Sequence, residues 1–160
     1  MTNHTDRNFL TTTSPMIKAV FTYWDRLRGD RPMPERAEFD PSAIPRHLPG
    51  VLLVEVEGVD PNGVGIYRYR VVGTMEVENR GHNPTGKLVS EGYFGASLEE
   101  SIATYEWVRR NKTCFYAPLD FVTDDHLPVS ELSILLPFGT ASGDVSHILV
   151  YSEPNDAGFK

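Results

Sequence analysis

The chain has 160 residues, of which 40% are hydrophobic and 23% are charged, and its formal net charge is −7. This length suits one ordinary domain with a single core, and the composition excludes a disordered or fibrous chain. The excess of acidic residues argues against a nucleic-acid partner, because affinity for phosphates is built largely from clustered Lys and Arg.

The cysteine count and the polar start bear on where the protein works. Cys114 is the only cysteine, so no disulfide within one chain and no cysteine-based metal cluster can form. Residues 1–13 lack the apolar region of a signal peptide, and no stretch approaches the roughly 18 apolar residues of a membrane span. The sequence therefore predicts a cytoplasmic protein with no membrane partner.

The first predicted element is an amphipathic helix over residues 14–29. Residues 1–13 are polar and aperiodic, which predicts a disordered tail. Ser14 is a suitable N-cap, Pro15 suits the first helical position, and Gly29 supplies the stop signal.

The apolar stripe of this helix has two interpretations. Such a stripe most often faces the core of its own domain, yet a helix before the first strand is also a natural place for dimer contacts. The candidate dimer-interface residues are Ile17, Val20, Phe21, Trp24 and Leu27.

A proline-rich connector and a hairpin follow the helix. Residues 30–50 contain five prolines, which predicts a connector with at most one helical turn. Val51–Glu57 and Gly65–Val72 are typical strands, and the turn-forming residues between them predict an antiparallel pair. Val51–Val54 is apolar on both faces, so we expect the N-terminal helix to cover the outer face of the sheet.

Two helices and three strands complete the pattern. Thr74–Arg80 predicts a short helix, and the capping pattern of Ser97 with Glu100 opens a second helix that ends near Asn111. The predicted strands after it are 113–123, 129–138 and 145–152. The fold class is therefore α+β: a five-stranded antiparallel sheet over residues 51–153, with helices inserted between strands 2 and 3, a flanking N-terminal helix and a tail over 154–160.

The order and spacing of several short segments resemble the PAS domain, and within it an uncharacterised proteobacterial PAS-like family. The resemblance covers roughly residues 15–152, and it is carried by Tyr23–Gly29, Phe39-Asp40-Pro41, Ile44-Pro45, Leu48-Pro49, Tyr69–Thr74, Gly81 and Thr85-Gly86. It implies a stand-alone sensory or interaction domain without enzyme activity. Only nine residues follow Tyr151, so we expect the signal to leave by contact with an unidentified signalling protein, from a homodimer.

The resemblance leaves the ligand open, because PAS-type cavities can hold haem, flavin, small metabolites or nothing. The light-sensing branch has a cysteine in the region that matches His82-Asn83-Pro84, whereas Cys114 falls at the third strand. For haem, His82 is the best placed axial ligand, although its neighbours are also typical of an exposed turn. A haem or flavin sensor therefore stays as the alternative, the cofactor is unknown, no metal site is predicted, and a small enzyme is the least favoured interpretation.

A small organic ligand is the other functional option. We expect apolar and aromatic residues between the sheet and the helices to line its cavity, with tyrosine hydroxyls as polar contacts. The candidates are Tyr67, Tyr69, Val71, Met75, His82, Leu88, Tyr105, Phe115, Leu132 and Ile134. The competing interpretation is that these residues form an ordinary packed core.

Overall fold

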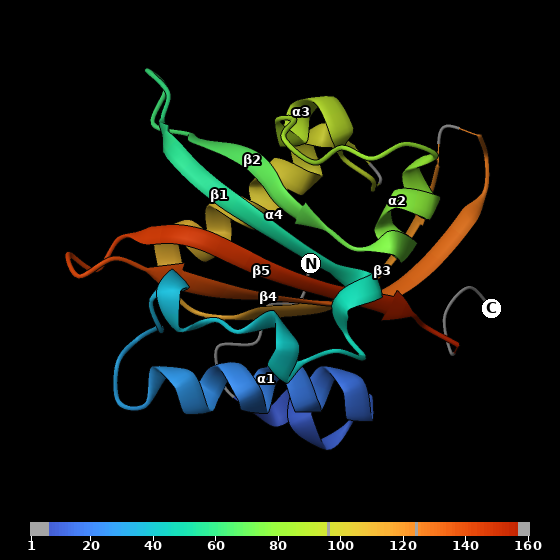
Figure 1. Cartoon of the computed structure of the whole chain (residues 1–160). Helices are drawn as coiled ribbons and strands as arrows, with labels where there is room; N and C mark the ends of the chain where they lie inside the picture. Colours follow the sequence, from blue (N-terminus) through green and yellow to red (C-terminus); the bar gives the residue numbers. More distant parts are fainter. Residues whose placement is uncertain (1–6, 96, 124, 157–160) are drawn as a thin grey trace.

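A computed structural model describes residues 7–95, 97–123 and 125–156. Its five strands form one antiparallel sheet in the order β2-β1-β5-β4-β3, with α1 on one face and α2, α3 and α4 on the other (Figure 1). The strands are β1 (Val51–Val59), β2 (Gly65–Val72), β3 (Phe115–Val122), β4 (Pro128–Gly139) and β5 (Val145–Pro154). The helices are α1 (Pro15–Arg28), α2 (Thr74–Arg80), α3 (Val89–Gly92) and α4 (Leu98–Asn111).

This architecture confirms the predicted α+β class with helices inserted between β2 and β3. The boundaries of β2 and α2 agree with the sequence prediction, and β1 and β2 form the expected antiparallel pair. β5 continues to Pro154, one residue into the predicted C-terminal tail, while residues 157–160 lie outside the described part of the chain.

Helix α1 begins and ends where its sequence signals predict. The Ser14 hydroxyl accepts a hydrogen bond from the Ile17 amide at 3.1 Å, and Pro15 occupies the first turn, where its missing amide hydrogen is not needed. Gly29 follows the helix with φ of 60°, a conformation that favours glycine.

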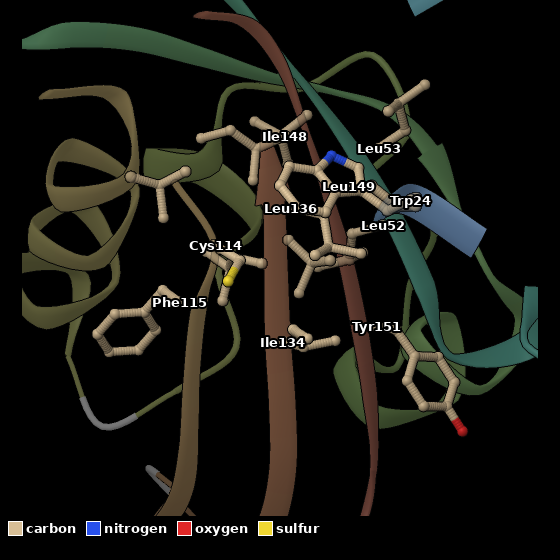
Figure 2. Close-up of a cluster of buried hydrophobic side chains, with 14 of the residues drawn as sticks. Trp24, Leu52, Leu53, Cys114, Phe115, Ile134, Leu136, Ile148, Leu149 and Tyr151 are labelled. Carbon is tan, nitrogen blue, oxygen red and sulfur yellow. The ribbon is translucent and has the colours of Figure 1, made fainter. Parts of the chain in front are cut away.

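The apolar stripe of α1 packs against the outer face of the chain's own sheet. Ile17 and Val20 are fully buried, Phe21 and Trp24 are each 3% exposed, and Leu27 is partly buried against the same core. Figure 2 shows Trp24 in the buried cluster with side chains of the strands. The assignment of this stripe to a dimer interface is therefore corrected: β4 and β5 are apolar on both faces, and α1 covers one of them.

The segment before α1 is also part of the fold. Asn8–Thr11 forms a 3-10 helix, and Phe9 is 2% exposed, with its ring stacked on that of Tyr116 at 4.9 Å between centroids. The predicted disordered tail over residues 1–13 is therefore wrong from Asn8 onward, because Phe9 supplies an apolar anchor that the polar composition obscured. Residues 1–6 lie outside the described ranges.

The connector between α1 and β1 contains more structure than one helical turn. Its 3-10 turns are Arg36–Glu38, Pro41–Ala43 and Leu48–Gly50. His47 is 6% exposed, and its Nε2 donates a hydrogen bond of 2.8 Å to the carbonyl oxygen of Met16. This contact holds the connector against the start of α1.

Gly73 marks the sharp change of direction between β2 and α2. Its amide donates to the carbonyl oxygen of Val51 at 2.7 Å, and a Cβ at this position would lie 2.1 Å from the carbonyl oxygen of Leu48. Only glycine fits such a close approach of two backbone segments. The placement of α2 over the inner face of the sheet depends on this contact.

Candidate functional site

A cavity of about 140 Å³ lies between the inner face of the sheet and helices α2 and α4. Its apolar floor is a row of paired residues on neighbouring strands, since Leu135 lies opposite Val150 and Val150 lies opposite Leu52. Aromatic side chains supply much of the wall: Tyr69, Tyr93, Phe94, Tyr105 and Phe121. Such a mixture of apolar surface and a few polar groups is typical of small-molecule sites.

Arg80 of α2 is the guanidinium that lines the cavity, and it is held from several directions. Its Nε donates to the carbonyl oxygen of Gly92 at 2.6 Å, and its Nη1 donates to the carbonyl oxygen of Glu76 at 3.0 Å. Nη2 donates to the Tyr69 hydroxyl at 3.3 Å, and the guanidinium also lies over the rings of Tyr69 and Phe94. With its side chain 3% exposed, Arg80 is a fixed part of the wall.

Two carboxyl groups, the buried one of Glu76 and the half-buried one of Glu131, face the same cavity. Glu76 is 4% exposed; its Oε2 accepts from Asn79 at 2.9 Å, while its Oε1 lies 3.9 Å from Arg80 Nη1, beyond hydrogen-bond distance. The side chain of Glu131 of β4 makes no hydrogen bond or ion pair within residues 7–95, 97–123 and 125–156. Burial and the charge of Glu76 raise the pKa of Glu131 to about 8, and burial also raises the pKa of Glu76.

The hydroxyl groups at the cavity differ in whether they have partners. Ser133 and Ser152 lie opposite each other on β4 and β5, and their hydroxyls are hydrogen-bonded at 2.8 Å. The Tyr105 side chain is 7% exposed, yet its hydroxyl makes no hydrogen bond to any described residue. Burial raises the pKa of this hydroxyl well above its usual range, so it stays protonated and can donate a hydrogen bond into the cavity.

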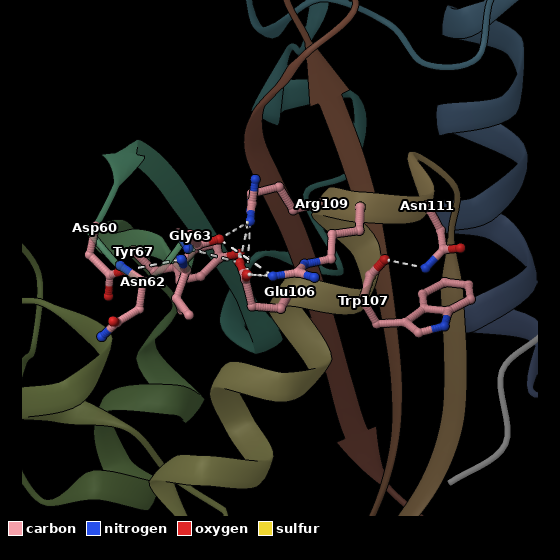
Figure 3. Close-up of polar contacts among 11 residues, drawn as sticks. Asp60, Asn62, Gly63, Tyr67, Glu106, Trp107, Arg109 and Asn111 are labelled. Carbon is pink, nitrogen blue, oxygen red and sulfur yellow. Dashed lines mark hydrogen bonds and ion pairs between the residues drawn. The ribbon is translucent and has the colours of Figure 1, made fainter.

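A second polar cluster fixes α4 to the β1–β2 hairpin beside the cavity. Glu106 accepts hydrogen bonds from the Tyr67 hydroxyl and from the Gly65 amide, and it pairs with Arg109 at 2.8 Å (Figure 3). Arg109 also donates to the carbonyl oxygen of Gly63 at 2.9 Å. The Arg109 contact, with those of Tyr67 and Gly65, lowers the pKa of Glu106 to about 2.

The Glu106 cluster fixes the position of the Tyr105 side chain. Because Tyr105 is adjacent to Glu106 on α4 and stacks on the ring of Tyr67 at 5.1 Å, the contacts of Glu106 set the position of its ring. The Glu106 cluster is thus the support for one wall of the cavity.

The structure brings only part of the predicted ligand-binding set together. Tyr69 and Tyr105 line the cavity, and Tyr67 and Phe115 are buried on the same face of the sheet without lining it. The remaining candidates lie away from the cavity: Val71 is 42% exposed, His82 is exposed, and Met75 and Leu88 are half-buried.

The prediction for β4 selected the wrong face of the strand. Side chains alternate along a strand, so Glu131, Ser133 and Leu135 face the cavity, whereas Leu132 and Ile134 point to the side covered by α1. The sequence reasoning missed Glu76, Arg80, Glu131, Ser133 and Ser152. For the strand residues among them, the sequence held a usable signal: Glu131 and Ser133 are polar residues at alternate positions of a largely apolar strand, which indicates that they share one face.

The residues considered for cofactors lie elsewhere. Cys114 is 4% exposed and borders a different hollow beside Phe21 and Trp24, and His82 does not line the cavity. The volume is below the roughly 300–1,000 Å³ of typical ligand pockets, so a haem or flavin would require the walls to move apart. In the part of the chain that the structure describes, no group of three or more His, Cys, Asp or Glu is placed to hold a metal ion. No helix among the described residues is long and apolar enough to span a membrane.

Comparisons with known proteins give a family match and several structural neighbours. A family model described as PAS domain matches residues 12–151. No curated protein matches the chain.

The structural neighbours have low sequence identity. The light-state structure of the blue-light photoreceptor Aureochrome1 LOV has 7% identity and a TM-score of 0.49, covering 72% of this chain and 88% of that one. The PAS domain of the fruit-fly ELK potassium channel has 16% identity and a TM-score of 0.47, with 72% and 97% covered. A fungal LOV domain photoreceptor has 9% identity and a TM-score of 0.49, with 92% and 98% covered. The assignment of the chain to a family therefore rests on the match of the family model.

Proposed function

Because the chain belongs to the PAS domain family, we propose that it is a sensory domain that binds a small molecule in the cavity between the sheet and helices α2 and α4. The observation that carries the proposal is the Tyr105 side chain, which borders this cavity, is 7% exposed, and has a hydroxyl that makes no hydrogen bond to the described residues. A bound molecule that accepts a hydrogen bond from this hydroxyl would gain about 0.5–1.5 kcal/mol.

The proposed signal is a shift between two packings of α2 and α4 on the sheet. Arg80 of α2 and Tyr105 of α4 both border the cavity, so a ligand contacts both helices at once. A ligand changes such an equilibrium only by its difference in affinity for the two packings. The partner that reads the change is proposed to be another signalling protein, and a second copy of this chain would have to use surfaces other than the buried stripe of α1.

The proposed role is binding and not catalysis. Several polar groups of the cavity form contacts that hold the walls, as Arg80 does with Tyr69 and Ser133 does with Ser152. A binding site of this kind needs only complementary contacts, whereas catalysis would require a nucleophile beside a base or another reactive pair.

A fragment screen with matched cavity variants tests this proposal. Thr104 lines the cavity from α4, and its hydroxyl bonds only to the carbonyl oxygen of Glu100 in its own helix, so Thr104→Leu fills space without disturbing another element. Ala103→Leu, at the exposed neighbouring position, is the control.

The readout is the ¹⁵N–¹H spectrum of the full chain with a small-molecule library. We expect hits to shift amides of α2, α4, β4 and β5 in the wild type and in Ala103→Leu, and to lose this effect in Thr104→Leu. Hits that shift other regions, or that bind Thr104→Leu equally well, would contradict a ligand site in this cavity.

A further inference from the structure

Acidic side chains outnumber basic side chains around the cavity, and this excess indicates the class of ligand. Glu76, Glu131 and the exposed Glu100 border it from α2, β4 and α4. Against these three carboxyl groups stands the single guanidinium of Arg80; no other basic side chain is among the described residues that line the cavity. Of the three, Glu76 has a partner on its own helix, since it accepts from Asn79.

Arg80 cannot neutralise the whole set. Its N–H groups donate to the carbonyl oxygens of Gly92 and Glu76 and to the Tyr69 hydroxyl. Its nearest carboxylate oxygen is Glu76 Oε1 at 3.9 Å. The half-buried carboxyl of Glu131 makes no ion pair within the described ranges, and burial and the charge of Glu76 raise its pKa by more than the charge of Arg80 lowers it.

The neighbouring surface distinguishes an organic cation from a metal ion. A metal ion would need several oxygen or nitrogen ligands at short distance, and no group of three such residues is assembled among the residues described. Aromatic rings and the apolar floor of Leu52, Leu135 and Val150 instead surround the carboxyl groups. Aromatic faces and carboxylates together are the surroundings that favour an ammonium group.

Resting on the proposed function, we infer that the cavity takes a small organic cation, whose ammonium group lies between Glu131 and Glu76 and whose apolar part lies on Leu52, Leu135 and Val150. Besides the electrostatics, the Tyr105 side chain is 7% exposed and its hydroxyl has no partner among the described residues, which suits a ligand that also carries an acceptor.

Binding of such a cation is coupled to the protonation of Glu131. The ionisable groups that face the cavity with Glu131 are Glu76 and Arg80 of α2, Tyr69 of β2, and Glu100 and Tyr105 of α4. The raised pKa of about 8 means that Glu131 of the empty cavity keeps its proton at neutral pH. An entering cation favours the ionised carboxylate, so the cation binds more tightly as the pH rises through this range.

The test uses ligand trios of one shape and different charge. Tetramethylammonium, tert-butanol and pivalate form a globular trio, and benzylammonium, benzyl alcohol and benzoate form a planar trio. Each is titrated into the full-length wild type, into Glu131→Gln, and into Glu99→Gln, which changes an exposed glutamate of α4 outside the cavity lining. Amide shifts report both the Kd and the location.

We expect the ammonium member of a trio to bind in the cavity more tightly than its neutral and anionic partners. Glu131→Gln should weaken the Kd of benzylammonium, whose N–H groups can donate to the carboxylate, by about ten- to a hundredfold, the range for hydrogen bonds to charged groups, and Glu99→Gln should leave it unchanged. The charge of tetramethylammonium does not change with pH, so its affinity should rise from pH 6 to pH 9 in the wild type and rise less steeply in Glu131→Gln, where only Glu76 still carries a raised pKa.

Two results would overturn the inference. One contradicts only the cation class of the ligand, and the other also contradicts the proposed ligand-binding cavity. If the alcohol or the carboxylate binds in the cavity and the ammonium compound does not, the cation class is wrong and the proposed ligand-binding cavity is unaffected. The same conclusion follows if no member of either trio binds in the cavity while the fragment library yields cavity ligands. If no compound of the trios or of the library binds in the cavity, both proposals fail.

Discussion

The indole Nε1 of Trp24 on α1 donates a hydrogen bond of 2.8 Å to the carbonyl oxygen of Pro137 on β4. This bond connects residues 113 positions apart in the chain, and it is buried. It shows that the N-terminal helix is a layer of the domain, packed on the face of the sheet opposite the cavity (Figure 1).

We predict that Trp24→Phe lowers the free energy of unfolding by about 2–3 kcal/mol. The substitution removes the donor to a buried carbonyl oxygen and leaves unfilled space in the core. Urea denaturation at neutral pH measures the loss. Lys18→Ala on the exposed face of the same helix should change stability by less than about 0.5 kcal/mol. An equally small effect for Trp24→Phe would show that α1 is not a stable layer of the domain.

The Glu106 cluster should make stability depend on acid. At pH 7 we expect Glu106→Gln to cost about 1–3 kcal/mol, since it removes the ionised acceptor for Arg109, Tyr67 and Gly65. The pKa of Glu106 is lowered from 4.5 to about 2 in the folded chain. Its stabilisation is therefore complete above pH 4.5 and is lost as the pH falls toward 2.

The corresponding measurement is urea denaturation of the wild type and Glu106→Gln between pH 7 and pH 2. The difference between the two should shrink below pH 4.5. A difference that stays constant over this range would mean that the contacts of Glu106 do not depend on its charge.

Glu131 should show the opposite pH dependence. Its folded pKa is raised from 4.5 to about 8 by burial and by the charge of Glu76, so the folded chain holds a proton that the unfolded chain releases. The wild type therefore loses stability as the pH rises from about 4.5 to 8, and Glu131→Gln removes this decline. Midpoints of urea denaturation at pH 5 and pH 8 measure it: relative to the wild type, the variant should gain stability at the higher pH. Parallel midpoints would place the carboxyl group in contact with water.

Gly73→Ala should be strongly destabilising. The added Cβ would lie 2.1 Å from the carbonyl oxygen of Leu48 and 2.4 Å from that of Pro49, and backbone atoms cannot move aside cheaply. We expect a loss of more than about 2 kcal/mol or failure to fold. Thr74→Ala, at the exposed next residue, is the matched control for soluble yield and for the denaturation midpoint. If Gly73→Ala is as stable as the wild type, the junction between β2 and α2 has space for a Cβ atom, which would contradict this account.

The layout of the elements could be predicted because their signals are local. Ser14, Pro15 and Gly29 bound α1 through capping and backbone geometry, and Ser97 opens α4 by accepting from the Glu100 amide. The strands were recognisable because apolar residues and turn residues alternate in blocks. These features depend only on residues close together in the chain.

The cavity could not be located in the same way, because it depends on which face of each strand meets which helix. Ile134, Leu135 and Leu136 are consecutive buried residues, so hydrophobicity alone does not tell which of them faces α4 and which faces α1. The prediction selected Ile134 and Leu132, whereas the cavity is lined by Leu135 and Glu131. Phe9 was missed for a related reason: a single anchor in a polar segment has no periodicity.

Native mass spectrometry of the full chain, incubated with the small-molecule fraction of a cell extract, is the most direct test of a ligand-binding cavity. We predict one small adduct on the wild type and on Ala103→Leu that is lost on denaturation and is absent from Thr104→Leu. Bare chains in all three samples, or the same adduct on Thr104→Leu, would contradict the assignment of the cavity as a ligand site.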